Sequence, residues 1–370
     1  MFKQMFTMVF VSVLVLSLTP LSADQVLPDD PYAYTWHELA PGVWSGLREN
    51  GPQAPVMGTS TFVVGDDGVV VFDGGGAPLM SERLMEKVAE VTDQPITHVV
   101  ISHWHGDHHF GIWRIIEEFP DVQVISHEFT RSATLGAPMD YIKDSGTAIE
   151  RFAVSANERL STGMESDGET PLSEDVLGYY RYVLEHKDLL EAQFKQYAAT
   201  AAAKTFENKM TIYTGTREIQ LLHVGVGNTE GDVIMWLPQE KIVATGDVVV
   251  LPTPYAFNVY PERWRDTLQA INELDYEILV PGHGEIQRNK DYTNLMIEAL
   301  DSIIEQSDQF LEAGLTQEEA ETRYDYSAFE QRFTGGDPYV AFFYNAYFVE
   351  PLSSAAYRAA KGEVLVELEP

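Results

Sequence analysis

Residues 96–108 read ITHVVISHWHGDH, an apolar run that passes directly into a cluster of histidines. The first half, 96–101, is short, apolar and rich in β-branched residues, which predicts a strand buried on both faces. The second half places three imidazoles and a carboxylate within six positions, just before a predicted helix at 111–118. Ends of strands that lead into helices are where sheet proteins bind ligands. The stretch therefore predicts a sheet protein with a functional site at the end of this strand.

The side chains of this cluster are those that first-row metals accept as ligands. Histidine and aspartate suit zinc or iron. In an extended segment, His103 and His105 point the same way, and Asp107 and His108 point to a neighbouring spot once the helix begins. Two adjacent metal ions fit this layout. The alternative, a polar surface loop with incidental histidines, leaves this density of ligand side chains beside an apolar strand unexplained.

The pattern on both sides of the cluster predicts two β-rich halves around a helical middle. The β-branched runs 59–64 and 69–72 flank Gly65–Gly68 and predict a hairpin. Residues 178–206, including the alanine-rich 198–203, predict one or two amphipathic helices. Further strands are predicted at 43–47, 122–125, 210–213, 217–224, 232–237, 241–244 and 276–280, and further helices at 81–92, 262–274, 290–312 and within 316–362. The predicted fold is α/β (or α+β): a four-layer αββα sandwich with a helical insertion at about 130–209.

The N-terminus has the pattern of a secretory signal. A short basic start precedes the apolar run Met5–Leu18, and Pro20 and small residues follow before Asp24. We therefore predict a signal peptide at 1–23, a main domain at 24–300 and a helical C-terminal extension at 301–370, in a periplasmic or secreted protein. An uncleaved N-terminal anchor is the alternative. No later segment is predicted to span a membrane.

The composition narrows the possible partners. The 370 residues include 24 basic and 57 acidic side chains, a net charge of −33, which argues against nucleic acid and anionic membranes. The absence of cysteine excludes disulfides, thiolate zinc ligands and cysteine nucleophiles. A small-molecule substrate is the predicted partner, and the sequence does not give the oligomeric state.

Four motifs together resemble the metallo-β-lactamase superfamily over about residues 40–290. The His-x-His-x-Asp-His motif follows the paired strands that end at Asp73. The loop 222–232, Thr245-Gly246-Asp247 and Pro281-Gly282-His283-Gly284 then follow in the family order, each after a predicted strand. The resemblance implies that residues 24–300 form a metallo-β-lactamase domain.

The resemblance also assigns metal ligands residue by residue. It places His103 and His105 on one metal, Asp107, His108 and His283 on the other, and Asp247 between the two. Asn228 stands where the family has a third histidine, and an amide is a poor zinc ligand. Either the first site has three protein ligands, or only the second site is filled, or His223 replaces the missing ligand. The resemblance further implies that Asp73 supports the ligands by hydrogen bonds.

These assignments predict a zinc-dependent hydrolase with one or two zinc ions. Activated water would attack the carbonyl of a small-molecule amide, lactam, ester or lactone, with His103, His105 and Asp107 as the catalytic group. An iron-dependent oxidoreductase of the same fold and a metal-poor binding protein are the alternatives. The helical insertion would form a lid, and Tyr255, Phe257 and Tyr260 would line a pocket for an apolar or aromatic acyl group.

Overall fold

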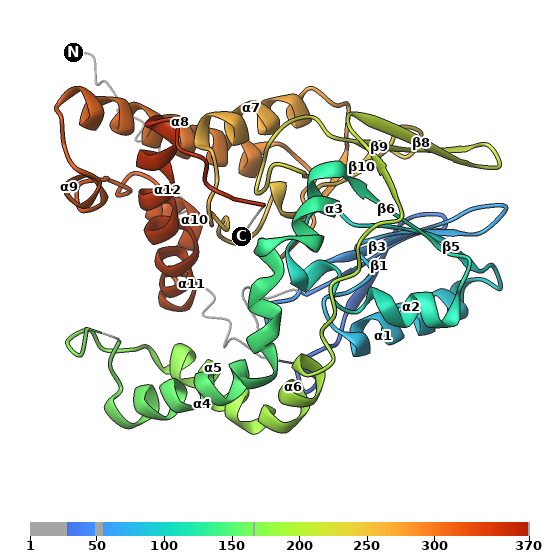
Figure 1. Ribbon diagram of the computed structural model, residues 1–370, viewed down its shortest axis with the longest axis horizontal. Helices are drawn as coiled ribbons and strands as arrows, with labels where there is room; N and C mark the ends of the chain where they lie inside the picture. Colours follow the sequence, from blue (N-terminus) through green and yellow to red (C-terminus); the bar gives the residue numbers. More distant parts are fainter. Residues whose placement is uncertain (1–27, 49–54, 166, 369–370) are drawn as a thin grey trace, which may run out of the picture.

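A computed structural model describes residues 28–48, 55–165 and 167–368 of the chain (Figure 1). The predicted signal peptide lies outside the described residues. Within the described ranges, every helix is too short or too polar to cross a membrane.

Two mixed sheets form the centre of the molecule (Figure 1). The first has the order β1 (Thr35–Ala40), β2 (Val43–Leu47), β3 (Ser60–Val64), β4 (Val69–Phe72), β5 (Ile96–Val100), β6 (Gln123–His127) and β7 (Lys204–Phe206). The second has the order β12 (Ile278–Val280), β11 (Ile242–Ala244), β10 (Ile234–Leu237), β9 (Arg217–Leu222) and β8 (Lys209–Thr214). The predicted hairpin is confirmed, because β3 and β4 pair antiparallel with Val64 opposite Val69. Strands β4 to β7 run parallel to one another, as do β11 and β12.

The two sheets pack face to face, and helices cover both outer faces. Val70 and Val100 of the first sheet share an apolar core with Met235 and Ile242 of the second. Helices α1 (Pro78–Val91) and α2 (Ile112–Glu118) pack on the first sheet. Helices α7 (Pro261–Asn272) and α8 (Asp291–Glu312) pack on the second. The predicted αββα sandwich is confirmed.

The insertion between β6 and β7 is helical, as predicted. It contains α3 (Glu128–Leu135), the 3₁₀ segment η2 (Ala137–Asp144), α4 (Ser145–Thr162), α5 (Glu174–Glu185) and α6 (Lys187–Phe194). The predicted helix over the alanine-rich 198–203 is wrong, since this segment is irregular and leads into β7. The following residues must be extended to pair with β6, and this pairing overrides the helix propensity of alanine.

The C-terminal region is also helical and joins the insertion to the sandwich. It comprises α9 (Gln317–Glu321), α10 (Glu330–Thr334), α11 (Pro338–Tyr344), a π-helical turn (Asn345–Val349) and α12 (Glu350–Ala360). Tyr339 and Phe343 pack with the insertion, whereas Tyr344 and Phe348 pack with the core around α7 and α8. Helix α8 runs across residue 300, and the domain boundaries drawn from the sequence stay predictions.

Candidate metal centre

Three strand ends bring the predicted ligands together at one edge of the two sheets. The segment after β5 carries His103 and His105 and then the short 3₁₀ turn η1 (Gly106–His108). Asp247 lies in a similar turn, η3 (Gly246–Val248), after β11, and His283 follows β12. Because β11 and β12 are parallel neighbours, their carboxyl ends meet at the same edge.

The structure gathers these side chains into two groups that share Asp247. One group contains Asp107, His108, Asp247 and His283, and the other contains His103, His105 and Asp247. Within each group the potential ligand atoms lie within 4.8 Å of one another. The six ligands predicted from three of the four motifs are therefore neighbours in space.

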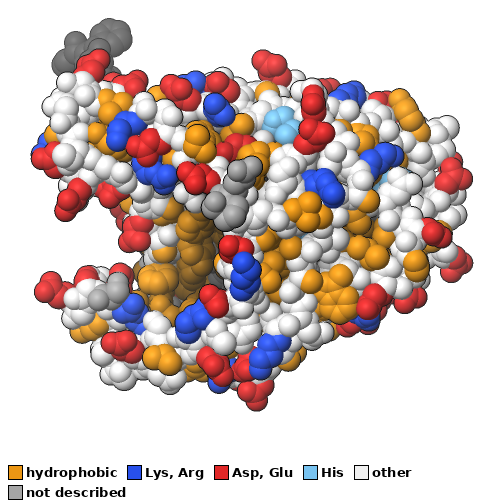
Figure 2. Space-filling view, viewed as in Figure 1, with side chains coloured by type: hydrophobic (Ala, Val, Ile, Leu, Met, Phe, Trp, Pro, Cys, Tyr) orange, Lys and Arg blue, Asp and Glu red, His pale blue; other side chains and the backbone are white. Residues whose placement is uncertain are grey.

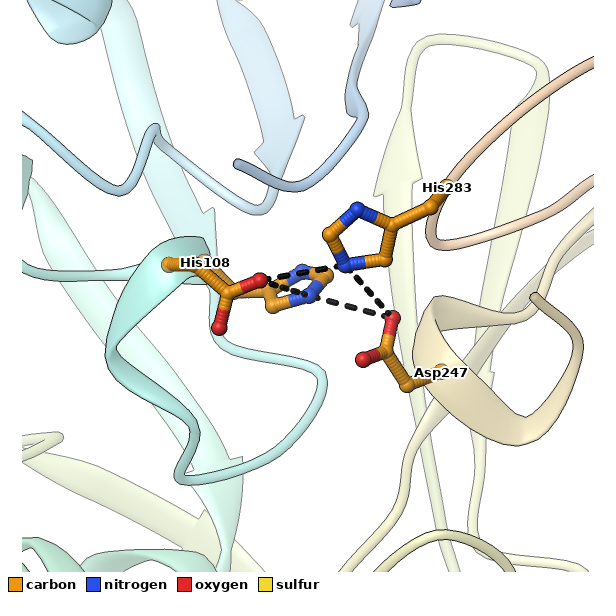
Figure 3. A group of neighbouring side chains, drawn as sticks. His108, Asp247 and His283 are labelled. Carbon is orange, nitrogen blue, oxygen red and sulfur yellow. Dashed lines mark ion pairs between the residues drawn. The ribbon is translucent and has the colours of Figure 1, made fainter. Parts of the chain in front are cut away.

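Asp247 directs one carboxylate oxygen toward each group. Its Oδ1 lies 3.1 Å from Nε2 of His108 and 3.4 Å from Nε2 of His283 (Figure 3). Its Oδ2 lies 3.6 Å from Nε2 of His103. Asp107 belongs to the group of His108 and His283, with Oδ2 3.0 Å from Nε2 of His283 and 3.4 Å from Nε2 of His108. This is the arrangement that a carboxylate bridging two cations requires.

The donor atoms of both groups fit metal ions. Nε2 of His103, His108 and His283 and Oδ1 of Asp247 are buried and have no hydrogen-bond partner among the described residues. A buried polar atom left without a partner costs about 1–3 kcal/mol. Four such atoms converging on one edge of the fold indicate that cations satisfy them.

Charge and burial prepare these groups for cations in different ways. Burial opposes ionisation of Asp107, but His108 and His283 outweigh it and lower the pKa of this carboxyl. Burial also lowers the pKa of His283, yet Asp247 and Asp107 raise it overall to about 9. Burial lowers the pKa of His105 and holds it neutral, which is the form that binds metal. The carboxylates of Asp107 and Asp247 therefore stay ionised, and their negative charge favours the binding of cations at this site.

Asp73 lies where a supporting carboxylate was predicted. Its Oδ2 is 2.9 Å from Nδ1 of His108, and its Oδ1 accepts a hydrogen bond from the backbone N–H of Ser102 at 2.8 Å. The sequence did not single out Ser102 as a supporting residue, although its hydroxyl lies 2.9 Å from Nδ1 of His103. These contacts orient both imidazoles so that Nε2 faces the centre.

Glycines allow the loops of the centre to approach closely, and the sequence analysis missed their role. A Cβ atom on Gly58 would lie 2.4 Å from the ring of His108, and one on Gly282 would lie 2.0 Å from Oδ1 of Asp247. The Pro-Gly-His-Gly motif could have identified Gly282 from the sequence, whereas Gly58 lies in no motif.

Asn228 is buried in the loop after β9. Its Nδ2 donates to the backbone carbonyl of Tyr255 at 2.6 Å, and its Oδ1 has no partner among the described residues. Asp232 holds this loop by accepting hydrogen bonds from the backbone N–H groups of Thr229 and Gly227 at 2.6 and 3.2 Å. Metal binding by Asn228 stays a prediction.

His223 has partners of its own outside the two ligand groups. Its Nδ1 lies 2.8 Å from the carbonyl oxygen of Asp232, and its ring stacks on His127 with centroids 4.2 Å apart. These contacts engage His223 in supporting the loop, and His223 belongs to neither ligand group.

A cavity of about 620 Å³ opens above the centre. Asp107, Asp247 and His105 line its floor, and the helical insertion contributes much of its wall, as predicted for a lid. Figure 2 shows a hollow with apolar walls between the insertion and the C-terminal helices. Tyr255 and Phe257 line the cavity, as predicted.

The prediction for Tyr260 is wrong. This residue lies on a separate cavity, where its hydroxyl accepts a hydrogen bond from the backbone N–H of Leu365 at 2.9 Å. Tyr260 immediately precedes α7, and the start of that helix turns its side chain toward the C-terminal tail.

A four-layer sandwich with a paired His/Asp centre at its strand ends defines the class of metal-dependent hydrolases built on two sheets. Comparison with known families agrees, since the model of the metallo-β-lactamase superfamily matches residues 54–283. The chain belongs to the metallo-β-lactamase superfamily.

Individual relatives are distant. The linear primary-alkylsulfatase of Pseudomonas sp. (strain ATCC 19151) is 20% identical over 273 residues, which cover 68% of this chain and 47% of that protein. An atrochrysone carboxyl ACP thioesterase of Pseudocercospora fijiensis (strain CIRAD86) is 34% identical over 88 residues, 23% of this chain and 26% of that protein. This chain thus spans about half the length of the alkylsulfatase.

A solved structure extends the likeness to most of the fold. The stereoselective inverting sec-alkylsulfatase Pisa1 from Pseudomonas sp. matches with a TM-score of 0.57 at 16% identity, over 88% of this chain and 50% of that one. The alkylsulfatase and the thioesterase are hydrolases by name, which agrees with the predicted class of metal-dependent hydrolase.

Proposed function

We propose that the protein is a zinc-dependent hydrolase that adds activated water to the carbonyl group of a small-molecule ester, lactone, amide or lactam. The observation that carries this proposal is the convergence of unpartnered ligand atoms from both sheets beneath the cavity. The predicted signal peptide supports a periplasmic or secreted location.

The ligand types support zinc. His103, His105 and Asp247 would hold one ion, and the group around His108 and His283 would hold the other. Bound zinc lowers the pKa of water to about 7 and polarises a carbonyl oxygen. A metal-poor binding protein is disfavoured, because the four-residue group would leave buried ligand atoms of His108, Asp247 and His283 without hydrogen-bond partners.

The chain's own residues supply orientation and proton handling. Asp73 and Ser102 fix the imidazoles of His108 and His103. Asp107 lines the cavity, and its side chain is 24% exposed, against 2% for that of Asp247. Asp107 is therefore the carboxylate placed to receive a proton and pass it to the departing group. The apolar walls exclude bulk water from the reaction.

The first test is the metal content of protein purified without added metal, measured by elemental analysis. About two zinc ions per chain would support a binuclear hydrolase, and about one would support the four-ligand group alone. Iron in place of zinc would overturn the proposal in favour of the oxidoreductase.

The variant Asp247→Ala completes this test. We expect it to lose metal from both groups and to lose hydrolysis of model esters, because Asp247 is the residue that they share. Circular dichroism would verify that the variant is folded. Full metal content and activity in folded Asp247→Ala would contradict the shared-ligand role.

A further inference from the structure

The cavity above the metal centre is lined by apolar and aromatic side chains, without lysine or arginine among its described lining residues. Of its 22 lining residues, ten are aromatic and eight are aliphatic or proline. The other four are His105, Gly106, Asp107 and Asp247, which belong to the floor. Among the described residues, neither lysine nor arginine lines this cavity.

This lining is unsuited to an anionic substrate. Carboxylate, sulfate and phosphate groups are normally bound by arginine, lysine or backbone N–H donors. An anion placed against these walls would lose its water without gaining a partner, and burying an unpaired charge is costly. The net charge of −33 adds repulsion on the way to the cavity.

Neutral hydrogen-bond donors are present in the same walls. Tyr179, Tyr255 and Tyr347 line the cavity, and the rings of Tyr255 and Tyr347 meet edge to face with centroids 5.0 Å apart. No hydrogen bond joins the hydroxyls of these three tyrosines to another described residue. These hydroxyls are available to the oxygen atoms of an uncharged ligand.

The apolar wall opposite the catalytic loops comes from the insertion. Ile149 and Phe152 of α4, Val183 of α5 and Leu190 of α6 reach the cavity from three different helices. The scissile bond must lie near Asp107 and Asp247, so the rest of a substrate would lie against these helices.

Resting on the proposed hydrolase function, we propose that the substrate is an uncharged carbonyl compound whose extended apolar acyl or aryl group lies against helices α4–α6. The insertion then determines which substrates are accepted, because the metal centre itself contacts only the carbonyl group. Each methylene buried against this wall contributes up to about fourfold in binding.

Binding can be measured without catalysis by two fluorescent probes that share one scaffold. N-phenyl-1-naphthylamine is uncharged, whereas 8-anilino-1-naphthalenesulfonate carries a sulfonate. We expect the purified protein to bind the neutral probe at least about tenfold more tightly, because the cavity walls offer the sulfonate neither lysine nor arginine. Equal or tighter binding of the sulfonate would overturn the proposal.

The catalytic test uses p-nitrophenyl esters of increasing acyl length, from acetate to decanoate, with dodecyl sulfate as the anionic comparison. We expect kcat/KM to rise about two- to fourfold per added methylene and dodecyl sulfate to be left intact. Phe152→Ala should reduce this gradient. Val154→Ala, on the same helix but with a 71% exposed side chain, should not.

The outcomes separate the two proposals. If the purified protein holds no zinc and cleaves no ester, the hydrolase proposal fails, while the neutral-probe preference still reports on the cavity. If esters are cleaved but acetate and decanoate react equally, or if dodecyl sulfate reacts faster, the proposal on substrate class fails alone. If kcat/KM rises equally with acyl length in the Phe152 and Val154 variants, the insertion does not determine specificity.

Discussion

At the residue scale, Asp247 shows how one side chain can define a double centre. Its two oxygens face different imidazoles, and its backbone is fixed because the N–H of Gly282 donates to the carbonyl of Gly246 at 2.9 Å. A longer side chain would not fit, since Gly282 already lies against this carboxylate. The fixed position makes Asp247 a rigid part of the centre, while Asp107 is the more accessible acid.

Asp73 can be used to test how much a carboxylate that contacts the ligand His108 contributes to metal affinity. Its φ of 60° lies in the left-handed region, which asparagine also adopts readily. Asp73→Asn therefore removes the charge beside His108 with little backbone strain. We expect about 10- to 100-fold weaker metal binding, measured by competition with a chelator.

The exposed Asp67 of the β3–β4 turn supplies the control for this change. Asp67→Asn should leave metal affinity unchanged. Equal affinity in the two variants would mean that Asp73 positions the backbone of Ser102 and does not tune His108.

The position of Asn228 makes a second prediction at this scale. Asn228→His should raise zinc content, because an imidazole would complete the group of His103, His105 and Asp247. Asn228→Ala is the matched control, since it also loses the hydrogen bond to Tyr255 but adds no ligand. Zinc content measured per chain should rise only in the histidine variant, and no increase would show that position 228 does not face the metals.

The structure brings together the candidate ligands that were close in the chain or lay in a recognisable motif, and their binding of metal stays a prediction. His103 to His108 occupy one short segment, and Asp247 and His283 have diagnostic neighbours. Tyr260 was misplaced because the direction of its side chain depends on the start of α7. Local sequence carries little information about such directions.

At the element scale, helix α3 links the insertion to the loop of Asn228. The hydroxyl of Thr130 in α3 donates to the carbonyl of Gly231 at 2.9 Å. His127 caps this helix by accepting a hydrogen bond from the backbone N–H of Phe129 on Nδ1 at 3.1 Å. The cap needs a neutral imidazole, because a protonated Nδ1 cannot accept.

This cap predicts a pH dependence of stability. Burial and the nearby His223 lower the pKa of His127 to about 4 from 6.5. Between pH 6.5 and 4 the unfolded chain therefore binds more protons, so this contribution is complete above pH 6.5 and is lost as the pH falls toward 4. Because His127 is half-exposed, we expect a contribution on the order of 1 kcal/mol.

Urea unfolding of His127→Asn measures this contribution. Asparagine also caps helices, so the variant should match the wild type near neutral pH within about 0.5 kcal/mol. Between pH 6.5 and 4 the wild type should lose more stability than the variant. Parallel pH profiles would show that protonation of His127 is not linked to unfolding.

Element-level prediction found most of the strands and helix α8, but it missed β1 and placed β7 within a predicted helix. Strands such as 96–101 can be recognised from their apolar character, and α8 can be recognised because its apolar residues recur with a helical period. The helix predicted over 198–203 is wrong because alanine favours helices, whereas the pairing of β7 with β6 requires an extended chain directly after this segment. No short window of sequence contains that pairing.

At the scale of the whole molecule, the metal centre joins the two sheets. The first cluster of ligands follows β5 in one sheet, and Asp247 and His283 follow β11 and β12 in the other. The cavity likewise needs distant parts, since the insertion forms one wall and the turn bearing Tyr347 contributes to another. The sequence predicted the insertion as a lid, but the contact of Phe343 with the insertion depends on tertiary packing that no local pattern reveals.

This arrangement predicts that metal removal destabilises the entire fold. Without cations, the carboxylates of Asp107 and Asp247 lie close together at the junction of the sheets, and four buried ligand atoms lose their partners. A ligand present at about a thousand times its Kd adds about 4 kcal/mol to stability, so we expect a chelator to lower Tm by at least about 5 °C. Calorimetry should show recovery when zinc is restored. Asp247→Ala should be insensitive to the chelator, because it holds little metal to lose. A wild-type Tm that does not respond to chelation would mean that the two sheets hold together without the ions, which would confine the role of the centre to catalysis.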